Sequence, residues 1–310
     1  MNKKISVIGA GNVGATTAQR LFEKNYSEVA LIDIAEGIAE GKALDILQSG
    51  PVLGLDNYIN GSTNYDITKN SDIIVITSGI ARKPGMSRDD LLKINMNIVS
   101  EVTEKSLDAS PDALVIVVTN PLDAMAMQSY KVSGKKPNEV FGMAGVLDSA
   151  RFTTFISQSQ NTSVKSISSN VLGGHGDTMV PLLNNSFIGG KSLSESIKED
   201  ELNDLVDRTK NGGAEIVNYL KTGSAFYAPS ASIVQMVDAI SSDSKEVLPT
   251  TAYLQGEYGI NDLYFGVPAK LGKNGVEEII QYDLSDAEKE DLNKSAKAVK
   301  DTVIAMENLS

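Results

Sequence analysis

A glycine-rich turn near the start of the chain most constrains its fold. Residues 9–14 read Gly-Ala-Gly-Asn-Val-Gly, between the apolar run Ile5–Ile8 and a helical pattern. Gly9 permits a tight turn, Gly11 leaves space beside the backbone, and Gly14 lets a helix pack closely on a sheet. A helix beginning there presents free N–H groups and a partial positive charge. The pattern predicts a strand–turn–helix unit that can hold a phosphate group.

Short apolar runs alternate with helical patterns through the first half of the chain. The runs are near-continuously apolar, which is typical of strands buried on both faces of a parallel sheet. The predicted strands are Ile5–Ile8, Val29–Ile34, Ile73–Thr77 and Leu114–Thr119. The predicted helices are Val13–Lys24, Ala35–Gln48 and Asp90–Leu107. Repeated strand–helix–strand units indicate an α/β fold with a Rossmann-type doubly wound sheet.

The pattern changes after about Val146, where serine and asparagine become frequent and the alternation stops. We expect a Rossmann-type domain at residues 1–145 and a second, α+β domain at residues 146–310. Within the second, Val164–Leu172 looks extended and Glu201–Lys221 has a helical period. Asn274-Gly275 predicts a hairpin turn, and Ser285 with Glu288 predicts a capping box before a last helix.

An acidic residue extends the prediction from the glycine turn to a particular cofactor. Asp33 lies near the end of the second apolar run. A carboxylate there can accept hydrogen bonds from both hydroxyls of an adenosine ribose and would repel a 2′-phosphate. The combination predicts NAD rather than NADP. The alternative is a tight turn that binds no ligand, followed by an acidic strand end.

Composition excludes several classes of protein. The net charge of −12, without a basic run, argues against a nucleic-acid partner. The absence of cysteine removes disulfides and thiolate metal sites, and no metal site is expected. No apolar run approaches the roughly 18 residues of a membrane span, so we expect no membrane partner. Lys3 and Lys4 imitate a signal peptide, but the following glycines interrupt its apolar segment, so we expect a cytoplasmic protein.

Histidine occurs only once in the chain, so its position is informative. The single histidine, His175, lies among glycines in the stretch 173–177. Glycines allow close approach to the backbone, and an imidazole titrates near neutrality. His175 is therefore a candidate proton acceptor for hydride chemistry on an alcohol. The alternative is a structural histidine whose hydrogen bonds are satisfied in the core.

Two of the five arginines occur in one loop, which follows an apolar run. Arg82 and Arg88 lie within residues 79–90, after the predicted strand Ile73–Thr77. The loop is therefore at the carboxyl edge of the predicted sheet, where ligands bind in open α/β folds. Asn120 follows the next run at the same edge and could bind a ligand. The alternatives are a solvated loop and an ordinary Asn-Pro turn.

A third arginine is spaced to pair with a carboxylate. Asp148 and Arg151 are three residues apart, so a helix would place them on one face. The alternative is a surface ion pair that contributes only about 0.2–0.5 kcal/mol.

Taken together, these stretches resemble the lactate/malate dehydrogenase family along nearly the whole chain. The matching stretches, in the family's order and spacing, are residues 9–14, 33, 81–88, 118–121, 147–151 and 173–177. The loop Ala81–Arg88 resembles that of malate dehydrogenases of the lactate-dehydrogenase-like type, because lactate dehydrogenases have glutamine where this chain has Arg82. The small residues within Gly223–Phe226 also favour a resemblance to malate dehydrogenases over lactate dehydrogenases.

The resemblance implies reversible hydride transfer between (S)-malate and NAD, giving oxaloacetate and NADH. His175 would exchange the proton of the C2 hydroxyl, and Asp148 would orient its imidazole. Arg151 would bind the C1 carboxylate through paired hydrogen bonds. Arg88 would polarise the C2 carbonyl once the loop closes, and Arg82 would bind the distal carboxylate.

The resemblance also implies which residues hold the cofactor. Asn120 would bind substrate and help to place the nicotinamide, next to a cis peptide bond to Pro121. The implied cofactor-binding residues are Gly9, Gly11, Asn12, Val13, Gly14, Asp33, Asn95, Val118 and Asn120. A homo-oligomer, tetramer rather than dimer, and a place in the tricarboxylic acid cycle are further expectations.

Three other functions remain open at this point. A lactate or other 2-hydroxy-acid dehydrogenase would share the fold, but Arg82 argues against it. A short-chain dehydrogenase needs Tyr-x-x-x-Lys on a helix; Tyr65–Lys69 fits the string but comes too early, in a turn-like stretch. A non-catalytic NAD-binding sensor would not need His175, Asp148 and three arginines in the family's register.

Overall fold

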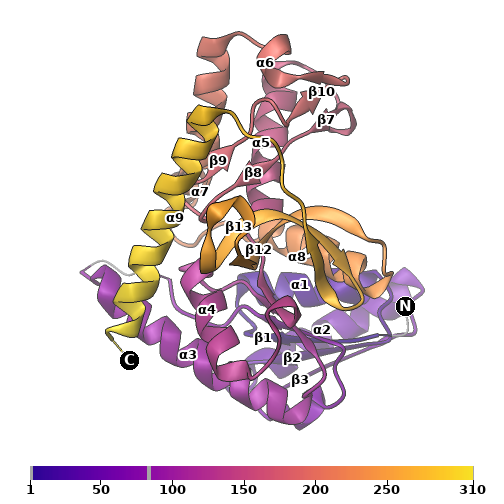
Figure 1. The fold of residues 1–310 in the computed structure, drawn as a ribbon. Coiled ribbons are helices and arrows are strands. Elements are labelled where there is room, and N and C mark those ends of the chain that lie inside the picture. Colours follow the sequence, from indigo (N-terminus) through magenta and orange to yellow (C-terminus); the bar gives the residue numbers. More distant parts are fainter. Residues whose placement is uncertain (1–2, 82–84, 310) are drawn as a thin grey trace.

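The computed structural model describes residues 3–81 and 85–309, and these form a large twisted sheet flanked by helices (Figure 1). Nine strands of the described chain lie in the order β14-β13-β12-β6-β5-β4-β1-β2-β3. The parallel part has the order 3-2-1-4-5-6 of a dinucleotide-binding sheet. Its strands are β1 (Lys4–Ile8), β2 (Glu28–Ile32), β3 (Tyr58–Ser62), β4 (Ile73–Ile76), β5 (Leu114–Val117) and β6 (Val140–Gly142).

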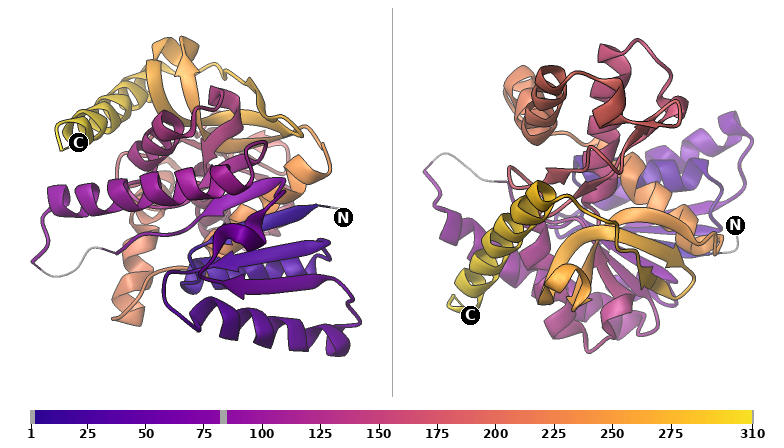
Figure 2. Two further views of the ribbon diagram at one scale, coloured as in Figure 1. Left: turned by 90° about the horizontal axis from the view of Figure 1, so that it is seen from below. Right: turned by 45° about the horizontal axis from the view of Figure 1, so that its top comes forward.

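Helices cover both faces of this sheet (Figure 2). On one face lie α1 (Asn12–Glu23), α2 (Ile38–Leu53) and α8 (Tyr227–Ser241). On the other lie α3 (Arg88–Ala109), α4 (Leu122–Ser133) and the carboxyl-terminal α9 (Asp286–Glu307). In residues 3–81 and 85–309, no helix combines the length and apolar character that crossing a bilayer requires.

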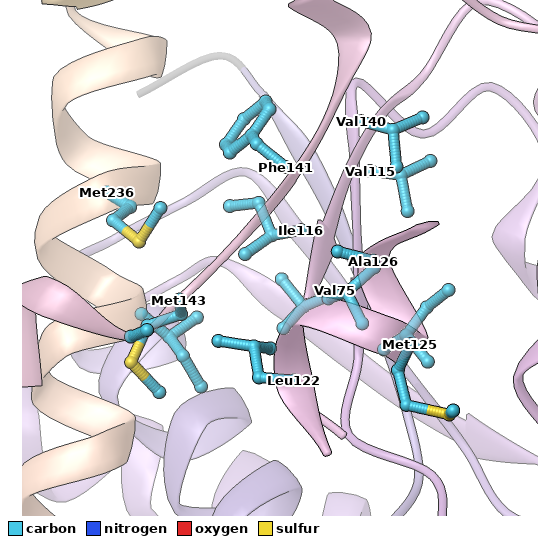
Figure 3. Packing of buried hydrophobic residues seen from close by; sticks show 14 of the residues in the cluster. Val75, Val115, Ile116, Leu122, Met125, Ala126, Val140, Phe141, Met143 and Met236 are labelled. Atoms are coloured by element: carbon cyan, nitrogen blue, oxygen red, sulfur yellow. The ribbon is translucent and has the colours of Figure 1, made fainter. Parts of the chain in front are cut away.

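The core lies between the sheet and its two helical layers. Val75, Val115 and Ile116 alternate between faces of the sheet, and all three are fully buried. Figure 3 shows them packed with Leu122 and Met125 of α4, among other apolar side chains. Burying one such side chain contributes about 1.5–3 kcal/mol relative to its exposure. This double burial explains why the strands are almost uninterruptedly apolar in the sequence.

The strand and helix predictions for the first half are confirmed, with small differences at the ends. The four predicted strands correspond to β1, β2, β4 and β5, and the three helices to α1, α2 and α3. Helix α2 begins at Ile38 rather than Ala35 and continues past Pro51 to Leu53. The edge strand β3 was not predicted, because its sequence, Tyr-Ile-Asn-Gly-Ser, has weak strand propensity.

The carboxyl-terminal half contributes strands to the same sheet, which the sequence did not predict. Strands β12 (Glu246–Gln255), β13 (Asn261–Gly272) and β14 (Gly275–Ile279) form an antiparallel meander. β12 pairs with β6 antiparallel at Thr251 and Gly142, so the meander extends the parallel sheet. The predicted hairpin at Asn274-Gly275 is confirmed, with Gly275 at φ +86°. The capping box of Ser285 and Glu288 before α9 is also confirmed.

A smaller lobe stands above the sheet and completes the α/β fold (Figure 1). It contains α5 (Gly145–Ser159), α6 (Leu193–Ser196), α7 (Glu199–Leu220) and the short strands β7 (Ile167–Ser168), β8 (Val171–Leu172), β9 (Val180–Pro181), β10 (Phe187–Ile188) and β11 (Lys191–Ser192). The prediction of one extended stretch at Val164–Leu172 was therefore wrong in detail. A 3₁₀ turn at Val164–Ser166 precedes two separate two-residue strands. The helix α7 agrees with its predicted period.

Candidate active site

The glycine turn at the carboxyl end of β1 is closely packed on one side and open on the other. A Cβ on Gly14 would lie 1.8 Å from the carbonyl oxygen of Gly9, so a larger residue there would force the backbone to shift. Gly9 adopts φ +106°, which favours glycine. A Cβ on Gly11 would have no neighbour within 4 Å, which leaves the space beside this peptide free. The turn thus combines tight helix–sheet packing with an accessible backbone.

The start of α1 and the end of β2 complete a site of the kind that holds a dinucleotide. Gly11 caps α1 without a side-chain hydrogen bond, so the amide groups of the first turn face outward unsatisfied by a side chain. Asp33 accepts hydrogen bonds from the backbone N–H groups of Ala10 (2.7 Å) and Ala35 (3.0 Å). Those contacts fix the carboxylate beside the turn, and a carboxylate has further lone pairs for ribose hydroxyls. The residues present therefore fit NAD.

Asn95 and Asn120, both predicted to bind the cofactor, have different surroundings. Asn95 is fully buried, and its amide bonds to the backbone of Ile80 and to the carbonyl oxygen of Asn120 (2.7 Å). Asn95 thus connects the loops that follow β4 and β5. Asn120 is exposed at the sheet edge, beside half-buried Val118, and its peptide bond to Pro121 is cis. Any effect of Asn95 on a ligand acts through these loops.

The backbone around His175 is held by three elements that are distant in the sequence. The Gly173 N–H donates to the Gly266 carbonyl oxygen of β13 (2.9 Å). The Gly174 N–H donates to Ser295 Oγ of α9 (2.9 Å), and the His175 N–H donates to Asp123 Oδ2 of α4 (3.1 Å). A Cβ on Gly174 would lie 2.5 Å from the Val299 side chain. The glycines therefore allow this loop to pass between α9 and the sheet.

The His175 ring is held by a buried carboxylate from the first turn of α5. Nδ1 of His175 lies 2.9 Å from Oδ2 of Asp148, whose side chain is 3% exposed. This contact assigns the Nδ1 proton to the Asp148 bond and leaves Nε2 for a ligand. Burial lowers the pKa of His175, but the charge and hydrogen bond of Asp148 outweigh it and raise the pKa above its usual value. The pair can therefore accept and hold a proton.

Arg151 shares the same carboxylate and has unused hydrogen-bonding capacity. Its Nη1 lies 3.3 Å from Asp148 Oδ1, one turn away on α5. Its Nε is buried without a hydrogen-bond partner in the described chain. The Arg151 side chain lies against Gly212 and Gly213 of α7, where Cβ atoms would come within 3.2 Å of its Cδ and 3.5 Å of its Nη2. A partly exposed guanidinium with a buried, unpaired N–H is suited to bind a ligand carboxylate.

The structure brings together some of the predicted residues and not others. His175, Asp148 and Arg151 form one connected cluster. Arg88 is exposed at the start of α3, and its side chain has no hydrogen bond or ion pair with any described residue. Arg82 lies outside the described residues. The roles of both loop arginines therefore remain predictions.

Three residues of the site were missed by sequence analysis. Asp123 bonds to the His175 backbone, Thr251 Oγ1 donates to Asp123 Oδ1 (3.3 Å), and Ser295 holds Gly174. Only Asp123 carried a signal in the sequence: it is a single acid in the apolar stretch 122–127, which predicts a buried carboxylate. Thr251 and Ser295 are brought to the site by tertiary packing, because each lies more than 100 residues along the chain from the residue that it bonds.

Comparisons with known proteins point to one family. Residues 3–142 match the NAD-binding domain of lactate/malate dehydrogenases, and residues 145–309 match the α/β carboxyl-terminal domain of the same family. A malate dehydrogenase from Thermomicrobium roseum is 53% identical over 310 residues, which cover 100% of both chains.

Solved structures of both branches of the family are similar to this one. Malate dehydrogenase from Cryptosporidium parvum has a TM-score of 0.96 and 44% identity, covering 99% of this chain and 100% of that one. Lactate dehydrogenase of the same organism, complexed with lactic acid and nicotinamide adenine dinucleotide, has a TM-score of 0.96 and 40% identity, covering 99% of each. The sequence resemblance is thereby confirmed, and the chain belongs to the lactate/malate dehydrogenase family.

Proposed function

We propose that this chain transfers a hydride reversibly between (S)-malate and NAD, giving oxaloacetate and NADH, with His175 as the proton acceptor. The observation that carries the proposal is the buried Asp148 carboxylate, which contacts both His175 (2.9 Å) and Arg151 (3.3 Å). A general base and a carboxylate-binding group thereby lie side by side. A 2-hydroxy acid needs that combination, because its reacting hydroxyl neighbours its carboxylate.

The residues of the cluster divide the chemical work. Arg151 binds the C1 carboxylate of malate and so sets the C2 hydroxyl toward Nε2 of His175. His175 accepts the hydroxyl proton as the carbonyl forms, and Asp148 stabilises the resulting imidazolium. NAD, when bound, supplies the hydride acceptor. In the reverse direction, the protonated His175 returns its proton to the C2 oxygen of oxaloacetate as the carbonyl is reduced to the hydroxyl.

Substrate choice is assigned to the loop arginines. Arg88 would polarise the C2 carbonyl, and Arg82 would pair with the second carboxylate, which pyruvate lacks. A guanidinium buried without that partner costs several kcal/mol, so pyruvate should be rejected. The malate dehydrogenase name of the 53%-identical relative from Thermomicrobium roseum supports the same choice.

The test is kcat/KM for NADH oxidation with oxaloacetate and with pyruvate. We expect the wild type to favour oxaloacetate by a factor on the order of 10³ or more. Arg82→Gln should depress oxaloacetate reduction and raise pyruvate reduction. Arg208→Gln, which removes an exposed arginine paired with Glu215, is the matched control and should leave the ratio unchanged. Equal wild-type efficiency with both acids would refute the malate assignment.

A lactate dehydrogenase is the second candidate, because a solved lactate dehydrogenase has the same TM-score as a solved malate dehydrogenase. The fold therefore does not separate the two activities, and the keto-acid assay does. A non-catalytic NAD sensor would bind NADH but turn over neither acid.

The proposal extends to the organisation of the protein. We place the NAD-binding domain at residues 1–145 and the catalytic domain at residues 146–310, in a cytoplasmic enzyme of the tricarboxylic acid cycle. A homotetramer is supported by apolar side chains that are exposed on α2 and around the α7–α8 connection. These are Ile38, Leu44, Val52, Leu53, Val217, Tyr219, Leu220 and Tyr227.

The mass in solution tests this assembly. Light scattering on a sizing column should give four times the chain mass of 33.0 kDa. Val52→Glu, a charge on an 87% exposed valine of α2, should reduce that mass if the face is an interface. A monomeric wild type would refute the tetramer.

A further inference from the structure

A second buried carboxylate lies behind the proposed base, on its backbone side. Asp123, in the first turn of α4, is 6% exposed. Its Oδ2 accepts the His175 N–H (3.1 Å), and its Oδ1 accepts the Thr251 hydroxyl (3.3 Å). His175 is thus placed between two carboxylates, with Asp148 on its ring and Asp123 on its main chain.

The hydrogen bonds of Asp123 do not by themselves require a charge. An asparagine could accept the same His175 N–H through its carbonyl oxygen and direct its amide toward Thr251. The loop is also held independently by Gly266 and Ser295, through the N–H groups of Gly173 and Gly174. Geometry alone therefore leaves the negative charge of Asp123 unexplained.

That charge is costly where it lies. Burial raises the pKa of Asp123 to about 6, while the hydrogen bond and charge of His175 act in the opposite direction. The His175 N–H and the Thr251 hydroxyl donate to the two oxygens of Asp123 and so favour the ionised carboxylate, in a site whose burial disfavours ionisation. A neutral residue of the same shape would avoid that cost, so retaining the acid needs a reason beyond packing.

We propose that Asp123 is a positioning residue for proton transfer, whose buried negative charge adds to that of Asp148 and keeps the His175 imidazole basic. The inference rests on the proposed role of His175. It assigns the two acids different tasks: Asp148 orients the ring, and Asp123 holds the peptide and contributes charge from the backbone side of His175.

The charged surroundings on each packed element agree with this division. His175 faces Asp148 and Arg151 from α5 and Asp123 from α4, and both acids raise its pKa whereas Arg151 lowers it. Around Asp123 lie His175 of the loop and the uncharged Thr251 of β12. From the direction of α9 it meets Gly174, which packs on Val299. Among the described residues, His175 is the charged partner that shifts the pKa of Asp123.

The single histidine makes this proposal directly measurable. Tag-free protein labelled with ¹³C-histidine gives one imidazole signal, which reports the pKa of His175 without substrate or NAD. Asp123→Asn should lower that pKa by about 0.5–1 unit, as expected for one charge removed at an intermediate dielectric. Asp112→Asn, at an exposed position before β5, changes the net charge equally and should leave the pKa unchanged. An unchanged pKa in Asp123→Asn overturns the proposal.

A pH profile separates a charge effect from a loosened loop. Oxaloacetate reduction needs the protonated His175, so with a lower pKa the activity of Asp123→Asn should begin to fall at a lower pH than that of the wild type. Above the pKa its activity should be about 3–10-fold below that of the wild type, while the two low-pH plateaus should agree within about threefold. A loop that merely loosens lowers the plateau at every pH, and that outcome contradicts the proposal.

A second variant covers the case in which Asp123→Asn does not fold. Thr251→Val removes one hydrogen bond from the carboxylate, which should raise its pKa and partly neutralise it. The pKa of His175 should then fall as in Asp123→Asn, but by a smaller amount. An unchanged pKa in Thr251→Val would also overturn the proposal. If the His175 pKa falls as expected but His175→Asn stays fully active, the proposed function fails while this electrostatic inference stands.

Discussion

The glycine turn and the His175 cluster are both binding regions, but they are built in opposite ways. The turn uses backbone groups within residues 9–14 and one carboxylate, Asp33, from the adjacent strand. The cluster uses side chains from α4, α5, β12 and α9, which meet across more than 170 residues. The turn is formed mainly by residues adjacent in the sequence, whereas the cluster exists only in the tertiary structure.

This difference determines how each region responds to change. The turn depends on the absence of side chains, because a Cβ at Gly14 would strike the Gly9 carbonyl. The cluster depends on the presence of specific ionisable groups with their partners. Substitutions in the turn should therefore alter cofactor binding and stability, whereas substitutions in the cluster should alter turnover and leave cofactor binding intact.

The largest expected effect separates the two regions completely. His175→Asn removes the proton acceptor, so turnover should fall by about 10²–10⁴-fold, the usual contribution of a positioned base. NADH titration by fluorescence should give an unchanged Kd, because the glycine turn is untouched. Turnover close to that of the wild type would remove His175 from the mechanism.

Asp33→Ser tests the turn in the converse way. Loss of a carboxylate that accepts ribose hydroxyls should weaken NADH binding by about 10–100-fold, since hydrogen bonds to charged groups contribute about 1.5–3 kcal/mol. The preference for NAD over NADP should narrow as repulsion of the 2′-phosphate disappears. Kd values for NADH and NADPH measure both effects. A wild type that uses both cofactors equally well would contradict this role.

The smallest effect concerns stability within the NAD-binding half. Gly14→Ala places a methyl group 1.8 Å from the Gly9 oxygen, so it should lower the free energy of unfolding by about 1–3 kcal/mol. Gly41→Ala is the matched control, because a Cβ in that helical position meets nothing within 4 Å. It should raise stability by about 0.5–1 kcal/mol. Denaturant unfolding of both variants checks the contrast, and equal shifts would show that the turn tolerates a side chain.

Local features were predicted well from the sequence because their causes are local. The Asn274-Gly275 turn and the Ser285–Glu288 capping box depend on the backbone preferences of a few adjacent residues. The buried strands were predicted because burial on two faces requires an apolar residue at nearly every position. The acidic end of β2 beside the glycine turn followed from the same strand–turn–helix pattern.

The sequence by itself determined the parallel sheet, its glycine turn and the candidates His175, Asp148 and Arg151. Only the tertiary structure decided that β12 continues the sheet at Thr251 and that Asp123 lies behind His175. The physical reason is distance along the chain: Asp123 and Thr251 are 128 residues apart, and no local preference encodes their contact. Such contacts form because the helices and strands that carry them share one core, and this packing gives a buried carboxylate its partners.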